Sequence, residues 1–360
     1  MGILDNSYAM VLVSQKKFIK KTFQIPKIKD DELLLKVEMV SICGSDRHLY
    51  DGTHKASSFP KILGHEIVGF VDQIGEQASR EYCLKIGDRV TVEPYIMCKK
   101  CEYCLTGNYQ FHTPRKNYGV SLTCDKYPFL FGGYSEYMII LPGSKLHKIN
   151  QNVPAESACL SSVIGNGIRW VRTRAKVALG EAVAILGAGA LGLATVIAAK
   201  ESGAKPIIIL GISKDINKFK LAMEFGADFI IDMQKNNAIK EIEQITKSRM
   251  VEVAIECAGV DATVKATLSM VRHGGRIVLA GLTGGKQVDL CTDHIVNNEL
   301  IVMGGHGQAW DVEDAVRIIN SRKYPIEKII THKFPLTEVQ QAMDLFLEAP
   351  PECVRVALIP

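Results

Sequence analysis

Three cysteines at intervals of three residues, followed by a histidine, are the first residues of this chain that could do chemistry. Cys98, Cys101 and Cys104 form the pattern Cys-x-x-Cys-x-x-Cys, and His112 follows eight residues later. Thiolates and an imidazole are ligands that tetrahedral Zn²⁺ prefers, and four protein ligands leave no open position for a substrate. The spacing therefore predicts a structural zinc site. The alternative, three unrelated thiols in a loop, would leave oxidisable groups without a function.

A glycine-rich turn over residues 187–192 has the sequence GAGALG, which fits the pattern G-x-G-x-x-G. It follows an apolar strand expected over 182–186 and opens an alanine-rich helix. Gly187 permits the tight turn, Gly189 lets the backbone approach a pyrophosphate, and Gly192 lets helix and strand pack closely. The first amides and the dipole of the helix favour phosphate charge. We expect a dinucleotide here rather than a purely structural turn, bound by Gly187, Gly189, Ala190, Leu191 and Gly192.

The segment after the next expected strand, 206–210, bears on the choice between NAD and NADP. An acidic residue about 20 residues past the glycines accepts a hydrogen bond from the ribose 2′-hydroxyl and repels a 2′-phosphate. Ser213 stands where that acid would be expected, and Lys214 and Lys218 follow it. A hydroxyl and ammonium groups suit a phosphate, so the sequence favours NADP(H) over NAD(H). The alternative is that Asp215 reaches the ribose and Lys214 is only a solvated residue.

A second set of possible metal ligands combines Cys43, in the stretch SICGSD, with the pair His65-Glu66, in GHEIVGFVDQIG. Either piece alone is a weak indication, since a lone cysteine after a strand is usually a core residue. Together with the cysteine lobe, the glycine turn and the later stretch ECAG at 256–259, they form a specific combination. On these residues the chain resembles the zinc-containing medium-chain dehydrogenases, the alcohol and polyol dehydrogenase family. The resemblance covers essentially the whole chain.

The resemblance implies an α/β chain with two domains. A GroES-like, β-rich catalytic domain would be discontinuous, over 1–162 and 304–360, and a Rossmann domain with a doubly wound parallel sheet would occupy 163–303. The function implied is hydride transfer between NADP(H), or NAD(H), and a small alcohol or polyol or its carbonyl, with zinc. One alternative is a zinc-independent reductase of an activated C=C or C=O bond that keeps only the structural zinc. Another is a nucleotide-binding protein on the same scaffold without activity.

The resemblance also carries roles for individual residues. Cys43 and His65 would hold a catalytic Zn²⁺, which polarises a carbonyl or stabilises an alkoxide while the nicotinamide exchanges a hydride at the same carbon. Ser45 and His48 match the positions that relay the proton of the alcohol, since an imidazole titrates near neutral pH. His112 stands where the family usually has a fourth cysteine, and a Cys₃His set remains a competent zinc site.

The third ligand of the catalytic zinc is the clearest departure from the family pattern. Ser162 lies at the matching position, and a neutral hydroxyl is a poor zinc ligand. Three outcomes are open: Glu66 becomes the third ligand, Cys159 or Glu156 substitutes, or the catalytic zinc is weak or absent. We favour Cys43, His65 and Glu66, with water or substrate as the fourth group. Arg355 matches a position whose cation pairs with this glutamate and would steady it.

The elements that must position these residues follow from hydrophobic patterning. The first 160 residues read as short β-strands, and we expect a folded-over barrel. From residue 182 strands alternate with helical segments, which indicates βαβ units and a parallel sheet. The expected strands are 32–39, 67–73, 89–93, 182–186, 206–210, 229–231, 251–256, 276–280 and 354–359, and the expected helices include 190–202, 262–271 and 312–320.

Composition limits the class of protein. At about 150 residues per domain, 360 residues favour two domains. Hydrophobic residues make up 47% and charged residues 23%, as in ordinary globular proteins. A net charge of +4, without basic runs, argues against nucleic-acid binding. The longest apolar stretch, 182–199, is broken by glycines, so no membrane span is predicted, and no signal peptide is recognised. We expect a cytoplasmic enzyme with a small-molecule substrate, and the resemblance implies a homodimer or homotetramer.

Overall fold

A computed structural model describes residues 6–360, and the chain forms two compact units. The first unit contains the chain up to Ser162 with Val316–Arg322 and Ile326–Pro360, and the second contains Val163–Ala315 with Lys323–Pro325. Our expectation placed all of 304–360 with the first unit, whereas 304–315 and 323–325 lie with the second.

A six-stranded, fully parallel sheet forms the second unit, with the order β11-β10-β9-β12-β13-β14. This is the strand order of a doubly wound dinucleotide-binding fold, in which the topology reverses beside the first strand. The predicted fold class is therefore confirmed. The last strand, β14, was not among the expected ones. The strands are β9 (Val183–Leu186), β10 (Ile207–Gly211), β11 (Phe229–Asp232), β12 (Val251–Glu256), β13 (Val271–Leu279) and β14 (Ile301–Gly304).

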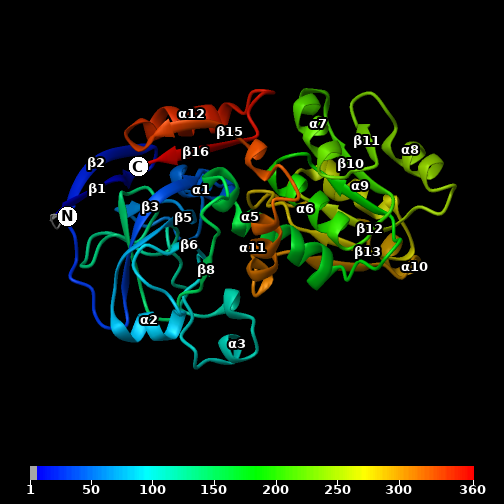
Figure 1. Cartoon of the computed structure of the whole chain (residues 1–360). Coiled ribbons are helices and arrows are strands. Elements are labelled where there is room, and N and C mark those ends of the chain that lie inside the picture. The colour runs from blue at the N-terminus through cyan, green and yellow to red at the C-terminus, as the bar shows by residue number, and fades with distance from the viewer. Residues whose placement is uncertain (1–5) are drawn as a thin grey trace. The chain divides into compact units, whose positions relative to one another are not determined.

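Burial on both faces explains why these strands read as short apolar runs. β10 has the sequence IIILG and is buried along its whole length, because helices flank the sheet on both sides (Figure 1). The helix after β9 is apolar nearly all round and packs on both β9 and β10. The helices of this part are α5 (Ser161–Ile168), the π-helix η2 (Arg169–Arg174), α6 (Ala190–Glu201), η3 (Ser213–Asp215), α7 (Ile216–Glu224), α8 (Ala238–Ile245), α9 (Asp261–Met270), α10 (Thr292–Asn297) and α11 (Asp311–Ser321).

The start of α11 belongs with the second unit for a local electrostatic reason. The Asp311 carboxylate accepts hydrogen bonds from Arg169 Nη1 at 3.3 Å and from Thr173 Oγ1 at 2.6 Å, and both donors lie on η2. Arg169 and Asp311 are buried, so separating them would leave uncompensated charges. This pair accounts for the difference from the expected boundary at residue 304.

The first unit is β-rich, as expected, but its strands form two sheets. One has seven strands, in the order β15-β16-β3-β5-β6-β8 with β7 on β3, and the other has the order β2-β1-β4. The expected strands 32–39, 67–73 and 89–93 correspond to β3, β5 and β6, whereas the β1–β2 hairpin was not anticipated. The strands are β1 (Asn6–Ser14), β2 (Lys17–Gln24), β3 (Leu33–Ser41), β4 (Lys61–Ile62), β5 (Glu66–Ile74), β6 (Arg89–Val92), β7 (Tyr137–Ile140), β8 (Leu146–Lys148), β15 (Ile330–Pro335) and β16 (Arg355–Ile359).

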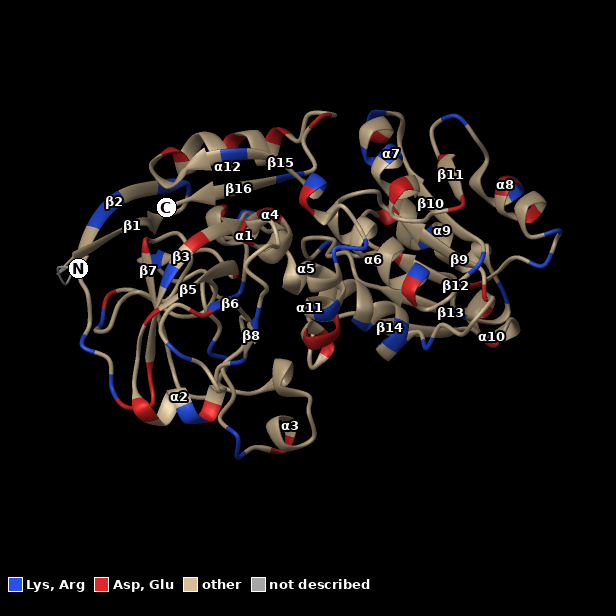
Figure 2. Ribbon diagram, viewed as in Figure 1, with Lys and Arg blue, Asp and Glu red and all other residues tan. Residues whose placement is uncertain are grey.

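Short helices connect these strands, and α12 runs beside β15 and β16 (Figure 1). They are α1 (Gly44–Tyr50), α2 (Glu76–Tyr82), α3 (Glu102–Leu105), η1 (Tyr109–Phe111), α4 (Ala155–Ala158), η4 (Ile326–Ile329), η5 (Leu336–Glu338) and α12 (Val339–Glu348). Acidic and basic residues are interspersed along both units (Figure 2). In the part of the chain that the structure describes, no helix is both long enough and apolar enough to cross a membrane.

Three neighbouring strands of the larger sheet bring distant residues together. β3 pairs with β5 so that Ser41 lies directly opposite Glu66, and β16 pairs with the same end of β3. Arg355 begins β16, and His65 immediately precedes β5. Cys43 follows β3 and is the N-cap of α1. The strand register therefore places all five residues at one end of the sheet.

A buried arginine ties β6 to the loop before α4. Arg89 donates to both carboxylate oxygens of Glu38, at 2.7 and 3.1 Å. It also donates to the backbone carbonyls of Asn150, at 3.1 Å, and Val153, at 2.6 Å. One guanidinium therefore satisfies a carboxylate and two carbonyls, and no shorter or neutral side chain can do this.

Replacing Arg89 by methionine should lower the free energy of unfolding by about 2–4 kcal/mol, because Glu38 and the Val153 carbonyl lose the hydrogen bonds that Arg89 donates. Urea denaturation would measure the change. Arg80→Met is the matched control: Arg80 and its partner Glu76 are 72% and 84% exposed, so this pair should contribute less than about 0.5 kcal/mol. Equal losses in the two variants would contradict the role of Arg89.

Candidate functional site

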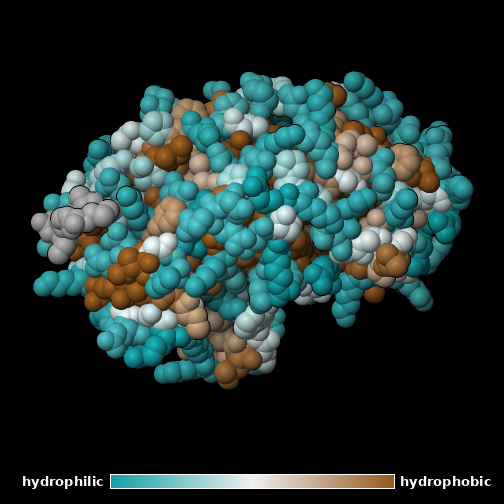
Figure 3. Space-filling model, in the orientation of Figure 1, coloured by the Kyte–Doolittle hydropathy of each residue, from teal (hydrophilic) through white to brown (hydrophobic). Residues whose placement is uncertain are grey.

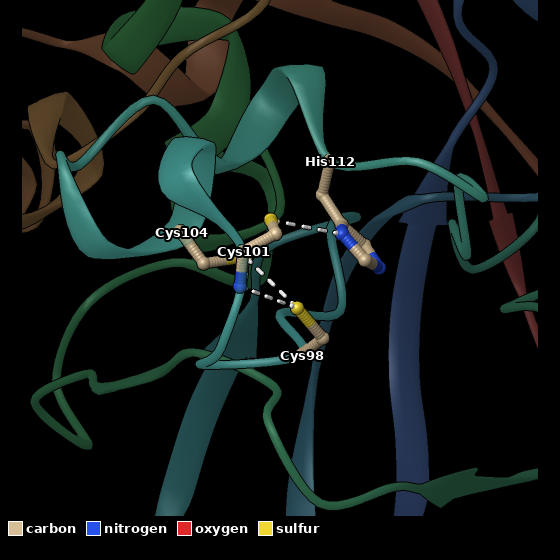
Figure 4. A group of neighbouring side chains, drawn as sticks. All are labelled: Cys98, Cys101, Cys104 and His112. Atoms are coloured by element: carbon tan, nitrogen blue, oxygen red, sulfur yellow. Dashed lines mark hydrogen bonds between the residues drawn. The ribbon is translucent and has the colours of Figure 1, made fainter.

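The predicted zinc lobe brings its four side chains into a compact group. Cys98, Cys101, Cys104 and His112 point toward a common centre (Figure 4), and one ligand atom from each lies within 4.8 Å of the others. Cys98 Sγ is 3.8 Å from Cys104 Sγ, and Cys101 Sγ is 3.4 Å from His112 Nδ1. Bonds of about 2.3 Å to sulfur and 2.0–2.1 Å to nitrogen, at tetrahedral angles, separate such atoms by about 3.6–3.8 Å. The geometry therefore fits a tetrahedral zinc ion.

Local backbone structure prepares this lobe for a metal. Cys101 is the N-cap of α3, Cys104 lies within α3, and His112 follows η1, so short helical turns position three of the four ligands. Cys98 Sγ accepts hydrogen bonds from the backbone amides of Lys100, at 3.4 Å, and Cys101, at 3.3 Å. These amides lower the pKa of Cys98 to about 7. Part of the thiol is thus ionised at neutral pH, in the form that zinc binds.

A second cluster in the first unit contains Cys43, His65 and Glu66, whose ligand atoms also lie within 4.8 Å of one another. His65 and Glu66 are buried, and Cys43 is half-buried. Cys43 lies in the loop after β3, and His65 and Glu66 lie at the start of β5, which is the neighbouring strand. A thiolate, an imidazole and a carboxylate are a donor set for zinc that leaves a fourth position open, as a catalytic site requires.

Asp46 holds the ligands of this second cluster in place. Its Oδ1 lies 3.4 Å from His65 Nδ1, and its Oδ2 accepts from the backbone amide of Cys43 at 2.9 Å and from the Tyr134 hydroxyl at 3.2 Å. A carboxylate beside one imidazole nitrogen favours a proton there and leaves Nε2 for a metal. Burial lowers the pKa of His65, but Asp46 and Cys43 outweigh it and raise that pKa well above its usual value.

Glu66 is held by an arginine and a serine. Arg355 Nη2 donates to Oε1 at 2.5 Å and to Oε2 at 2.7 Å, and Ser41 donates a further hydrogen bond to Oε2. Burial lowers the pKa of Arg355, but the Glu66 carboxylate, followed by Cys43, raises it above its usual value. Because a carboxylate has about four acceptor positions, Glu66 keeps capacity for a metal while it is held.

The three alternatives for the third ligand differ in geometry. Ser162 is buried and neutral. Glu156 forms an ion pair with Lys333 at 2.7 Å, and Cys159 Sγ faces the Glu156 carbonyl at 3.4 Å. Burial, and after it Glu66, raise the pKa of Cys159 well above its usual value, which disfavours a thiolate. Among the described cysteine, histidine and acidic residues, only Glu66 joins Cys43 and His65 in the cluster, so geometry favours Glu66.

Charge balance shows that the second cluster suits a divalent cation. With Cys43 as thiolate and His65 neutral, the forms in which both bind zinc, the group holds three anions, Cys43, Asp46 and Glu66, against the cation of Arg355. Its net charge is then about −2, and an uncompensated charge of that size in a buried site is costly. A Zn²⁺ ion would bring the sum close to zero. The residues therefore fit the catalytic metal that the resemblance implies.

The two relay residues contact different partners. Ser45 Oγ lies 3.2 Å from His65 Nε2, which places it beside the candidate metal position. His48 Nδ1 lies 3.3 Å from Thr53 Oγ1. In residues 6–360 no hydrogen bond joins Ser45 to His48 directly. A proton would need an intermediate hydroxyl or water molecule to pass between them.

The glycine turn of the second unit has room for a phosphate where one is expected. Gly187 has a φ of +104°, which L-residues with a side chain rarely adopt. A Cβ on Gly192 would lie 1.8 Å from the Gly187 carbonyl oxygen, so only glycine permits this contact between helix and strand. A Cβ on Gly189 would meet nothing within 4 Å. Gly189 is the N-cap of α6, whose first residues are Ala190 and Leu191. The open space in front of the helix amides fits a pyrophosphate.

The residues predicted to select NADP differ in whether their side chains are free to contact a phosphate. Lys214 is exposed, and it forms no ion pair among the described residues. Lys218 Nζ is buried against Asp215 Oδ1 at 2.8 Å, and Asp215 Oδ2 accepts from the Ile212 amide at 3.1 Å. Ser213 Oγ donates to Asp232 Oδ2 at 2.6 Å. Lys218 and Asp215 therefore neutralise each other, and Lys214 is the one of the three predicted residues whose charge remains available.

Sequence reasoning assigned no role to Asp46, Ser41 or Asp232. Asp46 could have been found, because it lies three residues after Cys43, the spacing at which an N-cap and the third residue of a helix contact each other. Ser41 and Asp232 carried no such signal. Their roles depend on strand register, which places Ser41 opposite Glu66 and Asp232 opposite Gly211.

Comparison with known protein families and structures decides the class of enzyme. Residues 29–151 match the alcohol dehydrogenase GroES-like domain, and residues 190–321 match the zinc-binding dehydrogenase domain. A D-arabitol-phosphate dehydrogenase from Enterococcus avium is 31% identical, over 90% of this chain and 89% of its own. The chain belongs to the zinc-containing alcohol and polyol dehydrogenase family. The resemblance seen in the sequence is thereby confirmed, and the chain is an oxidoreductase of this type.

Other relatives of this dehydrogenase cover its whole length. Sorbitol dehydrogenase from Bacillus subtilis is 31% identical over 99% of this chain and 98% of its own. The crystal structure of an alcohol dehydrogenase from Thermotoga maritima superposes with a TM-score of 0.89 at 27% identity, over 99% of both chains. A zinc-binding dehydrogenase from Sinorhizobium meliloti, solved bound to NADP, has a TM-score of 0.86 at 28% identity, over 99% of this chain and 100% of its own.

Removing the fourth ligand of the lobe should remove its metal. His112→Ala is expected to lose about one zinc equivalent per chain in elemental analysis, because three thiolates cannot close a tetrahedral site. His112→Cys, the control, should keep that zinc as a Cys₄ set. Full metal content in His112→Ala would show that these residues do not form a zinc site.

Two alanine substitutions in the glycine turn should have different effects. Gly192→Ala should lower the free energy of unfolding by about 1–3 kcal/mol, because its Cβ overlaps the Gly187 carbonyl. Gly189→Ala should leave stability nearly unchanged and weaken binding of NADPH and NADH, because its methyl group occupies the space expected for the pyrophosphate. Urea denaturation and fluorescence titration measure the two effects. Unimpaired binding in Gly189→Ala would place the pyrophosphate elsewhere.

Proposed function

We propose that this dehydrogenase transfers a hydride between a nicotinamide dinucleotide and a small alcohol or polyol, with a catalytic zinc held by Cys43, His65 and Glu66. The observation that carries the proposal is the cluster itself, in which the ligand atoms of Cys43, His65 and Glu66 lie within 4.8 Å of one another and Arg355 is buried against Glu66. When bound, zinc would polarise the substrate oxygen, and the nicotinamide would exchange the hydride. A site with three protein ligands leaves the fourth position for that oxygen.

The protein's own residues supply orientation and proton transfer. Asp46 fixes the His65 ring, and Arg355 with Ser41 fixes Glu66, so the ligands need little rearrangement when metal binds. Ser45 Oγ, beside His65, is placed to accept the alcohol proton. His48, whose Nδ1 lies 3.3 Å from Thr53 Oγ1, is the group from which that proton would leave.

The candidate substrates follow from the relatives. The similar proteins include dehydrogenases of D-arabitol phosphate, sorbitol, and erythritol or L-threitol, all of which are polyols or polyol phosphates. We propose a polyol as the substrate class for this chain. Turnover of a panel of polyols, polyol phosphates and simple alcohols would test this assignment.

We propose NADP(H) as the preferred cofactor. Two observations support this choice. β10 ends at Gly211, and Ser213 stands where an acid would be expected, so neither residue supplies a carboxylate at this point. Lys214, three residues after Gly211, presents an available ammonium group that can pair with a 2′-phosphate.

A zinc-independent reductase remains the second candidate function. The observation that favours it is the hold of Arg355 and Ser41 on Glu66, together with the neutral Ser162 at the usual third-ligand position. The two functions differ in metal content: about two zinc ions per chain for the dehydrogenase, and about one for the reductase, which keeps only the structural zinc.

Self-association through the edge of the parallel sheet is part of the proposal. β14 lies at that edge, and its Ile301 and Val302 are 53% and 37% exposed, although apolar edge strands usually pair or are covered. The face in Figure 3 is mostly hydrophilic, with hydrophobic residues in separate patches. We propose a homodimer as the basic assembly. We also propose a cytoplasmic location, because Cys98, Cys101 and Cys104 are arranged as thiol ligands rather than as a disulfide.

The substitution Cys43→Ala tests the catalytic metal site. Turnover should fall by about 10³-fold or more, because several kcal/mol of transition-state stabilisation are lost with the metal. NADPH affinity should stay within about twofold, and zinc content should fall by about one equivalent. Cys159→Ala is the control, since Cys159 lies outside the cluster, and it should keep its zinc. Full turnover in Cys43→Ala would reject the proposed function.

A further inference from the structure

Two neighbouring strands of the nucleotide-binding unit end in different residues. β10 ends at Gly211 and β11 ends at Asp232, and these two residues are direct partners in the parallel register. A Cβ on Gly211 would lie 2.9 Å from both Asp215 Oδ2 and the Phe219 ring. An acidic side chain at the end of β10 would therefore require the Asp215 and Phe219 side chains to move. The adjacent strand, β11, instead carries a carboxylate at its end, that of Asp232.

Asp232 is fixed beside the segment that follows β10. Its Oδ2 accepts the hydroxyl of Ser213 at 2.6 Å, and its Oδ1 accepts the backbone amide of Gln234 at 3.0 Å. The Gln234 side chain in turn accepts the backbone amide of Ser213 at 3.1 Å. Lys235 Nζ lies 3.6 Å from Asp232 Oδ2 and is largely exposed. The hydrogen bond from Ser213 and weaker contributions from Gln234 and Lys235 lower the pKa of Asp232, so this carboxylate is ionised at neutral pH.

This arrangement changes what Ser213 can offer a ligand. Ser213 stands 21 residues after Gly192, in the segment that faces the 2′ position of the adenosine ribose in this fold. Its hydroxyl proton is already donated to Asp232, so its oxygen is left as an acceptor. An acceptor suits the 2′-hydroxyl of NAD(H) and disfavours the 2′-phosphate of NADP(H). The Asp232 charge adds electrostatic repulsion of the phosphate, and it opposes the attraction by Lys214.

We propose that Asp232 is a specificity-determining residue for the dinucleotide, which weakens binding of the 2′-phosphate and limits the preference for NADP(H) that Lys214 creates. The inference rests on the proposed function, because it assumes that a nicotinamide dinucleotide binds at the glycine turn. Asp232, at the end of β11, then repels the 2′-phosphate, as an acid at the end of β10 would. The choice between NADP(H) and NAD(H) depends on the balance between this repulsion and the attraction by Lys214.

The test is fluorescence titration of the purified full-length protein with NADPH and with NADH, at low and at high salt. Asp232→Asn removes the charge and should tighten NADPH binding about tenfold while NADH binding stays within about twofold. High salt should reduce this gain. Asp228→Asn is the matched control. It removes the same charge at the opposite end of the two strands, where Asp228 accepts the Ile207 amide, and it should leave the NADPH-to-NADH ratio unchanged.

A second variant acts in the opposite direction and leaves the Asp232 carboxylate itself unchanged. Lys235→Gln removes an exposed ammonium that partly neutralises Asp232, so NADPH binding should weaken about threefold with NADH unchanged. Lys240→Gln, an exposed lysine on α8, is its control. Competition by 2′,5′-ADP, which carries the same phosphate, should follow NADPH in each variant.

The outcomes separate this inference from the proposed function. An unchanged NADPH-to-NADH ratio in both Asp232→Asn and Lys235→Gln would overturn the role of Asp232 while leaving the dehydrogenase intact. A parallel loss of both cofactors in Asp232→Asn, with an unmoved ratio in Lys235→Gln, would show a merely structural role and overturn it as well. Failure of the unmodified protein to bind either dinucleotide would reject the proposed function, and this inference with it.

Discussion

The ion pair between Glu66 and Arg355 is the constraint on which the first unit depends. The two residues are separated by 289 positions in the chain, and both are buried. Neither charge could remain in that position alone without a large desolvation penalty, so β16 must return to the sheet that contains β5. Ser41 lies on β3 between them and adds its own hydrogen bond to Glu66. The discontinuous organisation of this unit therefore follows from an electrostatic requirement as well as from apolar packing.

The same pair connects architecture to chemistry. An arginine that neutralises Glu66 leaves Cys43 and Asp46 as the excess negative charge, and this is the charge that a divalent ion can compensate. If Ser162 were an anionic ligand instead, the cluster would carry a further negative charge, and zinc alone would no longer balance it. The serine at this position is thus compatible with a metal site in which Glu66 is the third ligand. It would be less easily explained if Glu66 were only a structural partner of Arg355.

The sequence was sufficient to predict those features of the fold and the sites that depend on interactions between residues close together in the chain. The G-x-G-x-x-G turn, the cysteine lobe and the alternation of strands and helices each depend on residues close together in the chain, and the structure contains each of them. Pairing across strands was not accessible in this way. Lys218 looked like a free cation until the fold placed Asp215 against it, and Ser213 looked like a phosphate ligand until the register of β11 brought Asp232 to its hydroxyl. Such pairs require the three-dimensional neighbourhood, which a single sequence does not display.

The two candidate sites share an electrostatic feature. In each of them, a charged residue on a neighbouring strand lies beside the residues of the sequence motif. In the first unit, β16 supplies Arg355 to the glutamate of the His65-Glu66 motif. In the second, β11 supplies Asp232 to the segment that follows β10. A charge placed on an adjacent strand is positioned by the backbone register of the sheet, so it varies less than one placed on a mobile loop. This arrangement separates the motif that recognises a ligand from the residue that adjusts its charge, and the second can change in evolution without disturbing the first.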